Sequence, residues 1–390
     1  MNKELSKKRN SKMIGLDDYV APPMPADEWL KTLSLKVRAT FGRSGHRFVE
    51  AETLQRATLR RLDEAVAPPA CGPIVEALDA TIGDWISGPT TAERVKAVIL
   101  PPCDSNDVVG TWGRRAGLPV IAPGDESDAS SELARLQALN DDDDGIVVIP
   151  QLERWYLRRL GGLEDMRRLI ALLSAGRRRI VIGCNAWSWA YLSKACGIDM
   201  LVGEPICFAP FSGDKLREWF GELAHHDLTR GVRFRLADDG TDVLAMGDNE
   251  KTKAFFDSLA AHSRGIPWVA WHIWRRALHE QTTGNKPLRG GETDASIGET
   301  LWVAELETLV LPGDQPRDAL LILHSLLLHE QMSVADLASV LPIVGGSVIP
   351  AALAMGGFLK RDGDRLSIRP EAYPAIREGL KTAAMSLGKL

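Results

Sequence analysis

The chain has 390 residues, of which 45% are hydrophobic and 25% charged, with a formal net charge of −5 at pH 7. This composition is typical of a globular protein, and it excludes a disordered, a collagen-like and a disulfide-dense secreted chain. At about 150 residues per domain, the length corresponds to two or three domains. Because the net charge is negative, binding to nucleic acid phosphates or anionic lipids would need a local basic patch.

The cysteines and the apolar segments point to an intracellular location. Five cysteines, an odd number without CxxC spacing, lie mostly in apolar runs, which is typical of thiols in a reducing compartment. The basic first twelve residues are not followed by an apolar stretch of signal-peptide length. The apolar run at residues 319–328 is much shorter than the roughly twenty residues that span a bilayer. We therefore expect a cytoplasmic protein without membrane insertion.

The sequence predicts five parts in chain order. They are a flexible tail (1–25), a helical N-terminal region (26–88), an α/β core (89–230), a helical lid with a loop (231–316) and a winged-helix domain (317–390). Three prolines after residue 21 mark the first boundary, and residues 13–25 read as a linker. In the N-terminal region, apolar residues at helical intervals predict helices over 51–65 and 74–86.

Short apolar runs alternate with helical segments through the third part. The predicted strands are 95–100, 120–121, 146–149, 180–182 and 206–208. Alternation of this kind implies a parallel sheet covered by helices on both faces, the three-layer α/β arrangement. The four aspartates at 141–144 are expected in a solvated loop, because adjacent side chains point apart and do not converge on one metal ion.

Helices dominate the remainder. We expect helices at 251–262 and 267–279 and an exposed loop at 282–296. The last part reads as a helix over 319–329, a helix over 334–340 with Ser333 as N-cap, a helix over 348–355, and a hairpin over 358–368 that turns at Asp362-Gly363. Three helices followed by a hairpin is the order of a winged helix.

Over residues 90–380 this order resembles AAA+ ATPases of the origin-recognition or STAND type. In that family the first core strand leads into GPPGTGKT, which holds the nucleotide phosphates and magnesium. Here the strand is followed by Pro101, Pro102, Cys103, Asp104, Ser105, Asn106 and Asp107. Cys103 falls where a glycine belongs, Asn106 replaces the lysine, and Asp107 replaces the hydroxyl that holds magnesium. Because Asp104 and Asp107 would repel a polyanion, the resemblance implies a loop that does not bind phosphate.

The other nucleotide motifs of the family are altered as well. After the third strand the family has Asp-Glu, but this chain has Pro150 and Gln151, which supply neither a metal ligand nor a general base. Glu153 is expected to point elsewhere, because a helix is expected to follow the strand. Asn185 stands at the polar sensor position, although an Asn at a strand end is more often a turn former. Trp268 replaces the arginine that should contact the γ phosphate.

These changes together predict a pseudo-ATPase with no catalytic residue, no metal and no cofactor. Motifs of other enzymes, such as GxSxG, HExxH and GxGxxG, do not occur in the sequence. Weak nucleotide binding without turnover is the lesser alternative. A tryptophan stripe at every third position from Trp268 to Trp274 is expected in a core or a partner interface rather than under nucleic acid bases. Trp187 and Trp189 either fill the nucleotide cleft or pack near the surface.

The predicted winged helix bears on the choice of partner. Its third helix contains no Lys, Arg, Asn or Gln with which to read bases. Four basic residues gather in the hairpin and interleave with two aspartates: Lys360, Arg361, Arg365 and Arg369. We therefore expect a catalytically inactive scaffold or regulatory adaptor that works through a protein partner or self-association. A nucleic-acid-binding module that uses the hairpin is the alternative.

Overall fold

The computed structural model describes residues 12–25, 54–58, 62–63, 66, 72–87, 93–124, 128–142, 145–224, 232–245, 249–281, 300–307, 309–311, 316–385 and 387–390. The chain divides into two compact units. The first unit comprises Met1–Val20, Ala70–Ala209 and Leu309–Leu390, and the second comprises Ala21–Pro69 and Pro210–Thr308. The first unit contains a five-stranded and a three-stranded sheet, and the second contains a four-stranded sheet.

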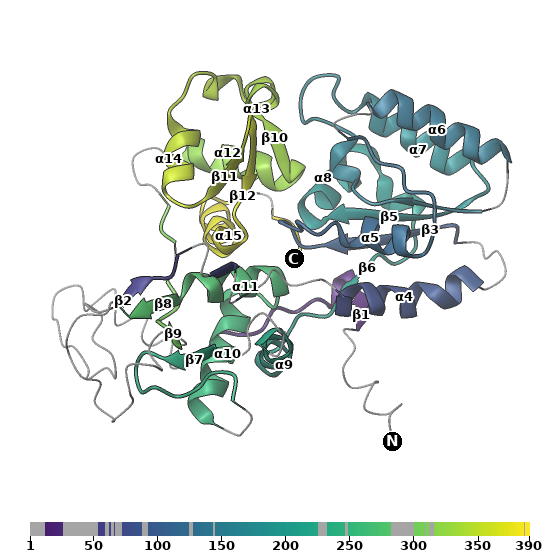
Figure 1. The fold of residues 1–390 in the computed structure, drawn as a ribbon. Helices are drawn as coiled ribbons and strands as arrows, with labels where there is room; N and C mark the ends of the chain where they lie inside the picture. The colour runs from purple at the N-terminus through teal and green to yellow at the C-terminus, as the bar shows by residue number, and fades with distance from the viewer. Residues whose placement is uncertain are drawn as a thin grey trace. The chain divides into compact units, whose positions relative to one another are not determined.

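The first unit is built on a five-stranded sheet with the order β1-β6-β3-β5-β4, of which β1, β6, β3 and β5 are labelled in Figure 1. Its strands are β1 (Met13–Gly15), β3 (Val95–Leu100), β4 (Ile146–Ile149), β5 (Arg179–Asn185) and β6 (Ile206–Phe208). The last four are parallel, and β1 pairs antiparallel with β6. Val120 extends the far edge through a parallel bridge to Val148. The predicted α/β class is confirmed by this sheet.

Burial on both faces explains why these strands are almost entirely apolar. All four residues of β4 and six of the seven in β5 are buried, as expected for a parallel sheet between two helical layers. Helices flank the sheet on both sides (Figure 1). They are α4 (Gly72–Ser87), α5 (Val108–Arg115), α6 (Ala129–Asp142), α7 (Glu164–Ala175) and α8 (Ala186–Cys196).

The strand connections place a crevice at the carboxyl ends of β3 and β5. From β3 the chain passes through α5 to Val120 at the edge beyond β4, whereas from β5 it passes through α8 to β6 on the other side of β3. Neighbouring strands whose connections leave in opposite directions form the switch point at which open α/β sheets bind ligands. The residues that follow Leu100 and Cys184 therefore lie at this switch point.

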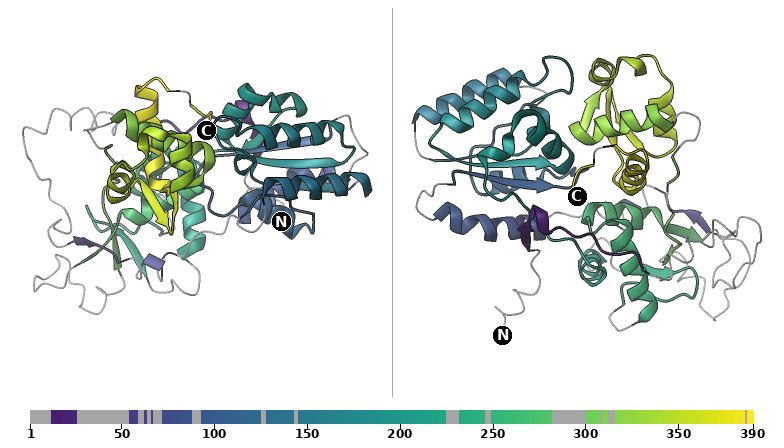
Figure 2. Two further views of the ribbon diagram at one scale, coloured as in Figure 1. Left: turned by 90° about the horizontal axis from the view of Figure 1, so that it is seen from above. Right: turned by 180° about the vertical axis from the view of Figure 1, so that it is seen from behind.

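The C-terminal region, residues 316–382, belongs to the same unit, and Figure 2 shows its helices and strands in two further views. Its elements are α12 (Pro316–His329), β10 (Gln331–Ser333), α13 (Val334–Val340), α14 (Ile349–Met355), β11 (Leu359–Asp362), β12 (Arg365–Ile368) and α15 (Tyr373–Thr382). The predicted three helices and hairpin are confirmed as elements, and Ser333 Oγ caps α13 by accepting from Asp336 N at 3.0 Å. Strand β10 adds a third strand beside β12.

The described residues of the second unit form helices and a four-stranded sheet. The helices are α9 (Gly213–Ala224), α10 (Glu250–His262) and α11 (Pro267–Arg276), and the sheet order is β2-β8-β9-β7. Its strands are β2 (Leu54–Arg56), β7 (Arg233–Leu236), β8 (Leu278–Gln281) and β9 (Thr300–Val303). Trp268, Trp271 and Trp274 are all buried in α11, which confirms the expected core position of this stripe.

Two sequence predictions are wrong because pairing with distant strands overrides the local pattern. Residues 54–56, expected in a helix, form β2, which pairs antiparallel with β8. Residues 13–15, expected in a linker, form β1 at the edge of the first sheet. The predicted helix over 267–279 ends at Arg276, where β8 soon begins. The expected loop at 282–296 lies outside the described residues. Within the described part of the chain, the helices are too short or too polar to cross a membrane.

Candidate functional site

A small cavity lies at the carboxyl ends of β3, β4 and β5, where the topology places the crevice. Its volume is about 20 Å³, which is enough for roughly one water molecule. Sites for ligands of drug size enclose about 300–1,000 Å³. The lining residues come from four segments: Leu100, Pro101, Asp104, Asp107, Val109, Pro150, Gln151, Glu153, Cys184, Asn185 and Glu330.

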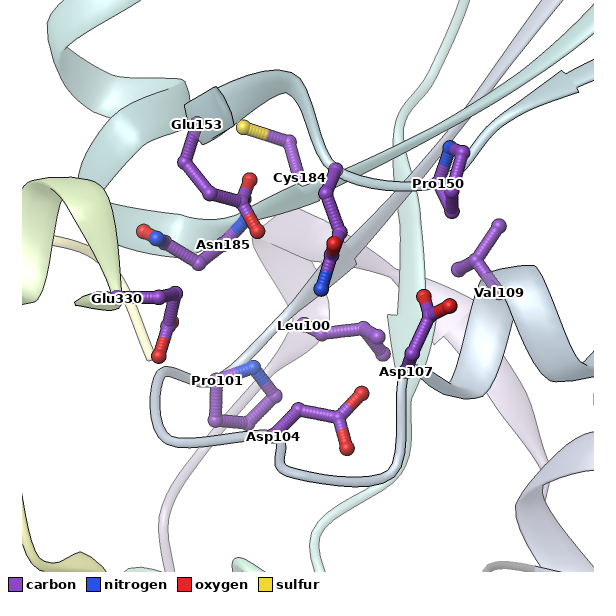
Figure 3. A pocket seen from close by; sticks show the side chains of 11 residues that line it. Leu100, Pro101, Asp104, Asp107, Val109, Pro150, Glu153, Cys184, Asn185 and Glu330 are labelled. Atoms are coloured by element: carbon purple, nitrogen blue, oxygen red, sulfur yellow. Dashed lines mark hydrogen bonds between the residues drawn. The ribbon is translucent and has the colours of Figure 1, made fainter. Parts of the chain in front are cut away.

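The polar lining of this cavity is dominated by carboxyl groups. Figure 3 shows that Asp104 and Asp107 come from the loop after β3, Glu153 from the turn after β4, and Glu330 from the turn that follows α12. No lysine or arginine is among the residues that line the cavity. A polyanionic ligand would therefore meet negative charge without a counter-charge.

The loop between β3 and α5 satisfies its own backbone amides. Asp104 accepts hydrogen bonds from Asn106 N and Val108 N, both at 2.9 Å. Asp107 is the N-cap of α5 and accepts from Gly110 N at 3.2 Å. In a phosphate-binding loop such amides point at the ligand. In this chain these amides donate to carboxylates of the loop itself.

Cys103 has a left-handed backbone conformation. Its φ is 68°, in the left-handed region that glycine adopts without cost, and the resemblance places a glycine there. Its amide donates to Glu330 Oε2 at 2.8 Å. A carboxyl group from the C-terminal region thus accepts a hydrogen bond from another amide of the same loop.

Glu153 lines the cavity, and the sequence-based expectation that it points elsewhere is wrong. The chain after β4 forms the 3₁₀ turn η3 (Leu152–Arg154) in place of an immediate α-helix. This turn leaves only 6% of Glu153 exposed and directs its Oε2 to Asn185 N at 3.2 Å. Glu330, which no motif in the sequence marked, is the other lining carboxyl that sequence reasoning missed.

Burial shifts the titration of three lining carboxyls toward neutral pH. Desolvation raises the pKa of Asp104 to about 6, against the hydrogen bonds from Val108 N and Asn106 N that lower it. Desolvation likewise raises the pKa of Glu153 to about 7. The pKa of Glu330 is raised well above its ordinary range by burial and then by the neighbouring Glu153. Near neutral pH, part of this cluster therefore carries protons.

Asn185 serves as a structural cap. Its Oδ1 accepts from Trp187 N at 2.9 Å and Ser188 N at 2.8 Å, which makes it the N-cap of α8. Its Nδ2 donates to Leu328 O in the C-terminal region at 3.4 Å. The side chain expected at the sensor position is thus engaged in holding two parts of the first unit together.

The tryptophans after β5 pack beside the cavity residues without lining the cavity. Trp187 is 2% exposed and donates through Nε1 to Tyr373 OH at 3.2 Å. Its ring also meets His324 edge-on, with 5.8 Å between centroids. Trp189 is buried as well. Trp187 therefore contributes to the contact between α8 and the C-terminal region.

Only some of the other predicted site residues line the cavity. Pro101, Pro150 and Gln151 do so. Pro102 is buried, Asn106 is half-buried and Ser105 is exposed. Trp268 is buried in the second unit at the start of α11. In the hairpin, Lys360, Arg361 and Arg369 are exposed and Arg365 is half-buried.

Helix α14 presents an apolar stripe to solvent. Val348 is 79% exposed and Met355 is 91% exposed, and Ala351 and Ala352 between them are also exposed. These positions are spaced i, i+3, i+4 and i+7, so they share one helical face. The opposite face inserts Leu353, which is fully buried.

The described side chains do not show the arrangement that a metal ion needs. Among the described residues, no group of three or more His, Cys, Asp and Glu side chains is placed to hold a metal ion. The carboxyl groups of the cavity are engaged mainly by backbone amides of the chain itself.

Comparisons with known proteins give only distant structural likenesses. No family model matches the sequence, and no curated protein matches it. The ORC2 protein of Aeropyrum pernix, in its ADPNP-ADP complexes, is 12% identical with a TM-score of 0.33, covering 88% of this chain and 100% of that one. The RuvB Holliday junction branch migration motor of Thermotoga maritima is 15% identical with a TM-score of 0.34, covering 84% and 97%. Cdc6p from Pyrobaculum aerophilum is 14% identical with a TM-score of 0.30, covering 82% and 96%. Scores of this size do not assign the chain to a family.

Proposed function

We propose that this protein is a catalytically inactive AAA+-like scaffold or regulatory adaptor of the cytoplasm, which acts through protein contacts. The observation that carries this proposal is the filling of the switch-point crevice by carboxyl groups of the chain itself. Asp104 and Glu330 accept hydrogen bonds from amides of the loop after β3. These are the donors that a nucleotide-binding loop keeps for phosphate.

Charge and space both argue against a nucleotide at this position. A triphosphate with magnesium needs cationic and metal-binding groups at the carboxyl edge of the sheet, whereas the cavity lining supplies carboxyls and no lysine or arginine. A cavity of about 20 Å³ is also far below the roughly 300 Å³ of the smallest ordinary ligand pockets. Both observations support a pseudo-ATPase.

The C-terminal region supports protein contact over DNA contact. If it acts as a winged helix, α14 occupies the position of the recognition helix, and its exposed stripe is apolar. Base edges in the major groove are read by hydrogen-bonding side chains, which this helix lacks. An exposed apolar helix face is the kind of surface that another protein covers.

Nucleotide binding is tested by thermal unfolding of the pure protein with and without ATP and magnesium. We expect no change in Tm and no phosphate release. A ligand at one hundred times its Kd stabilises the folded state by about 2.7 kcal/mol, so binding in the micromolar range would be visible at millimolar ATP. A rise in Tm without phosphate release would instead support the weak nucleotide-binding switch.

The adaptor role is tested by affinity purification from the native cell with a charged variant of the apolar stripe. We expect the Val348→Lys/Met355→Lys double variant to lose a companion that the unmodified protein retains. The matched control is Gln331→Lys/Ser339→Lys, which adds two lysines at exposed positions of the same region outside α14. Equal recovery of companions by both variants would contradict a role for the stripe.

DNA binding through the hairpin is the second candidate. The exposure of Lys360, Arg361 and Arg369 favours it, whereas Asp362 and Asp364, also exposed, oppose it. Salt-dependent retention on duplex DNA that disappears in the Arg361→Ala/Arg365→Ala/Arg369→Ala variant would establish this candidate over the adaptor.

A further inference from the structure

The turn at residues 328–330 fastens the C-terminal region to the carboxyl end of the parallel sheet. Leu328 O accepts hydrogen bonds from Asn185 Nδ2 at 3.4 Å and from Ser188 Oγ at 3.0 Å. Glu330 follows in a left-handed conformation, with φ of 59°, and reaches Cys103 N at 2.8 Å. The turn therefore contacts both strands that flank the crevice.

His329, between these two residues, adds a neutral contact. Its Nε2 accepts a hydrogen bond from Arg158 N at 3.3 Å, and its ring packs on Tyr156 with 4.7 Å between centroids. Burial lowers the pKa of His329 to about 4. The imidazole is therefore uncharged in this contact at neutral pH.

Glu330 brings its carboxyl group into a site that already holds Glu153 and Asp104. All three line one cavity of about 20 Å³ (Figure 3). Glu330 Oε1 is buried, and the Asn185 side chain lowers the pKa of Glu330 less than burial and Glu153 raise it. Three ionised carboxyls in a poorly hydrated space repel one another and lose their hydration, so the docked arrangement favours their protonated forms.

We propose that the turn at residues 328–330 is a pH-dependent latch, which holds the C-terminal region on the α/β core while Glu330, Glu153 and Asp104 share protons and releases it as they ionise. Release rehydrates Glu330 and separates it from the other two carboxyls. The latch uses carboxyl groups that also fill the crevice, but it does not require the protein to act as an adaptor, because its test measures only docking within the first unit.

Other titratable and charged groups surround the cluster, and among them the cation Arg154 acts on Glu153. Arg154, in η3, lowers the pKa of Glu153 less than burial raises it. Further groups that face the cluster or His329 are Cys103 and Asp107 in the loop after β3, Tyr156 and Arg158 after η3, Cys184 in β5, His324 in α12, Asp336 in α13 and Glu371 in the turn after β12.

The direction of the pH effect follows from the pKa shifts. Docking buries Glu330 beside Glu153, and both effects raise the pKa of Glu330 well above its ordinary value of 4.5. The docked state thus binds more protons than the released state, and docking weakens as pH rises from 6 to 8. His329 acts in the opposite direction, but from a free pKa of 6.5 its effect at pH 6 is only about fourfold.

Hydrogen–deuterium exchange of the full chain at pH 6 and pH 8, corrected for intrinsic exchange rates, tests the latch. We expect protection of peptides from α12 and β10 to fall at least about tenfold at pH 8, the effect of one pKa unit, while peptides from α6 and α7 keep theirs. In Glu153→Gln/Glu330→Gln, which retains the hydrogen-bond acceptors, this fall should disappear, and protection should change by no more than the roughly fourfold opposite effect of His329.

The control is Glu164→Gln/Glu378→Gln, which removes two exposed carboxyls, one from the α/β core and one from the C-terminal region. It should behave like the unmodified protein. Equal protection of α12 at both pH values in the unmodified chain would overturn the latch. An undiminished pH effect in the Glu330→Gln single variant, or a fall of the same size in α6 and α7, would overturn it as well.

Discussion

At the scale of single residues, the site depends on close approach of backbone segments beneath the cavity. Gly183, in the middle of β5, lies under the carbonyl of Pro150, so that an added Cβ would be 2.2 Å from Pro150 O and 3.0 Å from Val109 Cγ2. Real Cβ atoms do not approach backbone oxygen so closely. The strand can therefore carry only glycine here without a shift of the chain that follows β4.

Gly183→Ala should accordingly lower the free energy of unfolding by about 1–3 kcal/mol, the usual cost of overpacking a core. Gly83→Ala, in helix α4 with nothing within 4 Å of the added Cβ, is the control. It should raise the free energy by about 0.5–1 kcal/mol, because alanine has the better helix propensity. Urea unfolding of both variants measures the difference, and equal stabilities would contradict the close approach.

Residue patterns predicted some site positions and missed others for physical reasons. The loop from Pro101 to Asp107 and the end of β5 were predictable, because buried parallel strands read as apolar runs with polar residues at their ends. Glu153 was misplaced because the sequence does not show that a 3₁₀ turn follows β4. Glu330 lies far along the chain, and its position depends on a tertiary contact that no local periodicity encodes.

At the scale of elements, α14 carries apolar residues on both of its faces. Leu353 is fully buried, whereas Met355 is 91% exposed two residues later. We expect Leu353→Ala to cost about 2–5 kcal/mol through lost packing and the cavity left behind. Met355→Ala should change the stability of the isolated protein by less than about 0.5 kcal/mol. Thermal unfolding distinguishes the two, and a large loss in Met355→Ala would show that the stripe is covered within the chain.

Among the elements, those stabilised by local signals were predictable and those stabilised by pairing were not. Helix α13 begins after Ser333 as its N-cap pattern predicts. Strands β1 and β2 have three residues each and owe their conformation to β6 and β8. Strands so short carry too little periodicity to be distinguished from a linker or from a neighbouring helix.

At the scale of the whole molecule, the buried carboxyls make stability depend on pH. Glu153 has a pKa raised from 4.5 to about 7, so it stabilises the folded state fully below pH 4.5 and loses this contribution as pH rises through 7. Glu153→Gln should therefore increase the free energy of unfolding at pH 8, by up to about 3 kcal/mol, with little change at pH 4.5. Urea titrations at the two pH values measure this, and a decrease at pH 8 would contradict the burial of an ionisable group.

Strand β1 has a consequence for how the protein behaves in concentrated solution. Without it, β6 would display an open row of amides and carbonyls at the edge of an apolar sheet, which is a template for pairing with other chains. Three residues, Met13–Gly15, occupy that row, and the 3₁₀ turn Leu16–Asp18 follows at once with two acidic side chains. A variant that cannot form this strand should therefore precipitate long before it loses its helices.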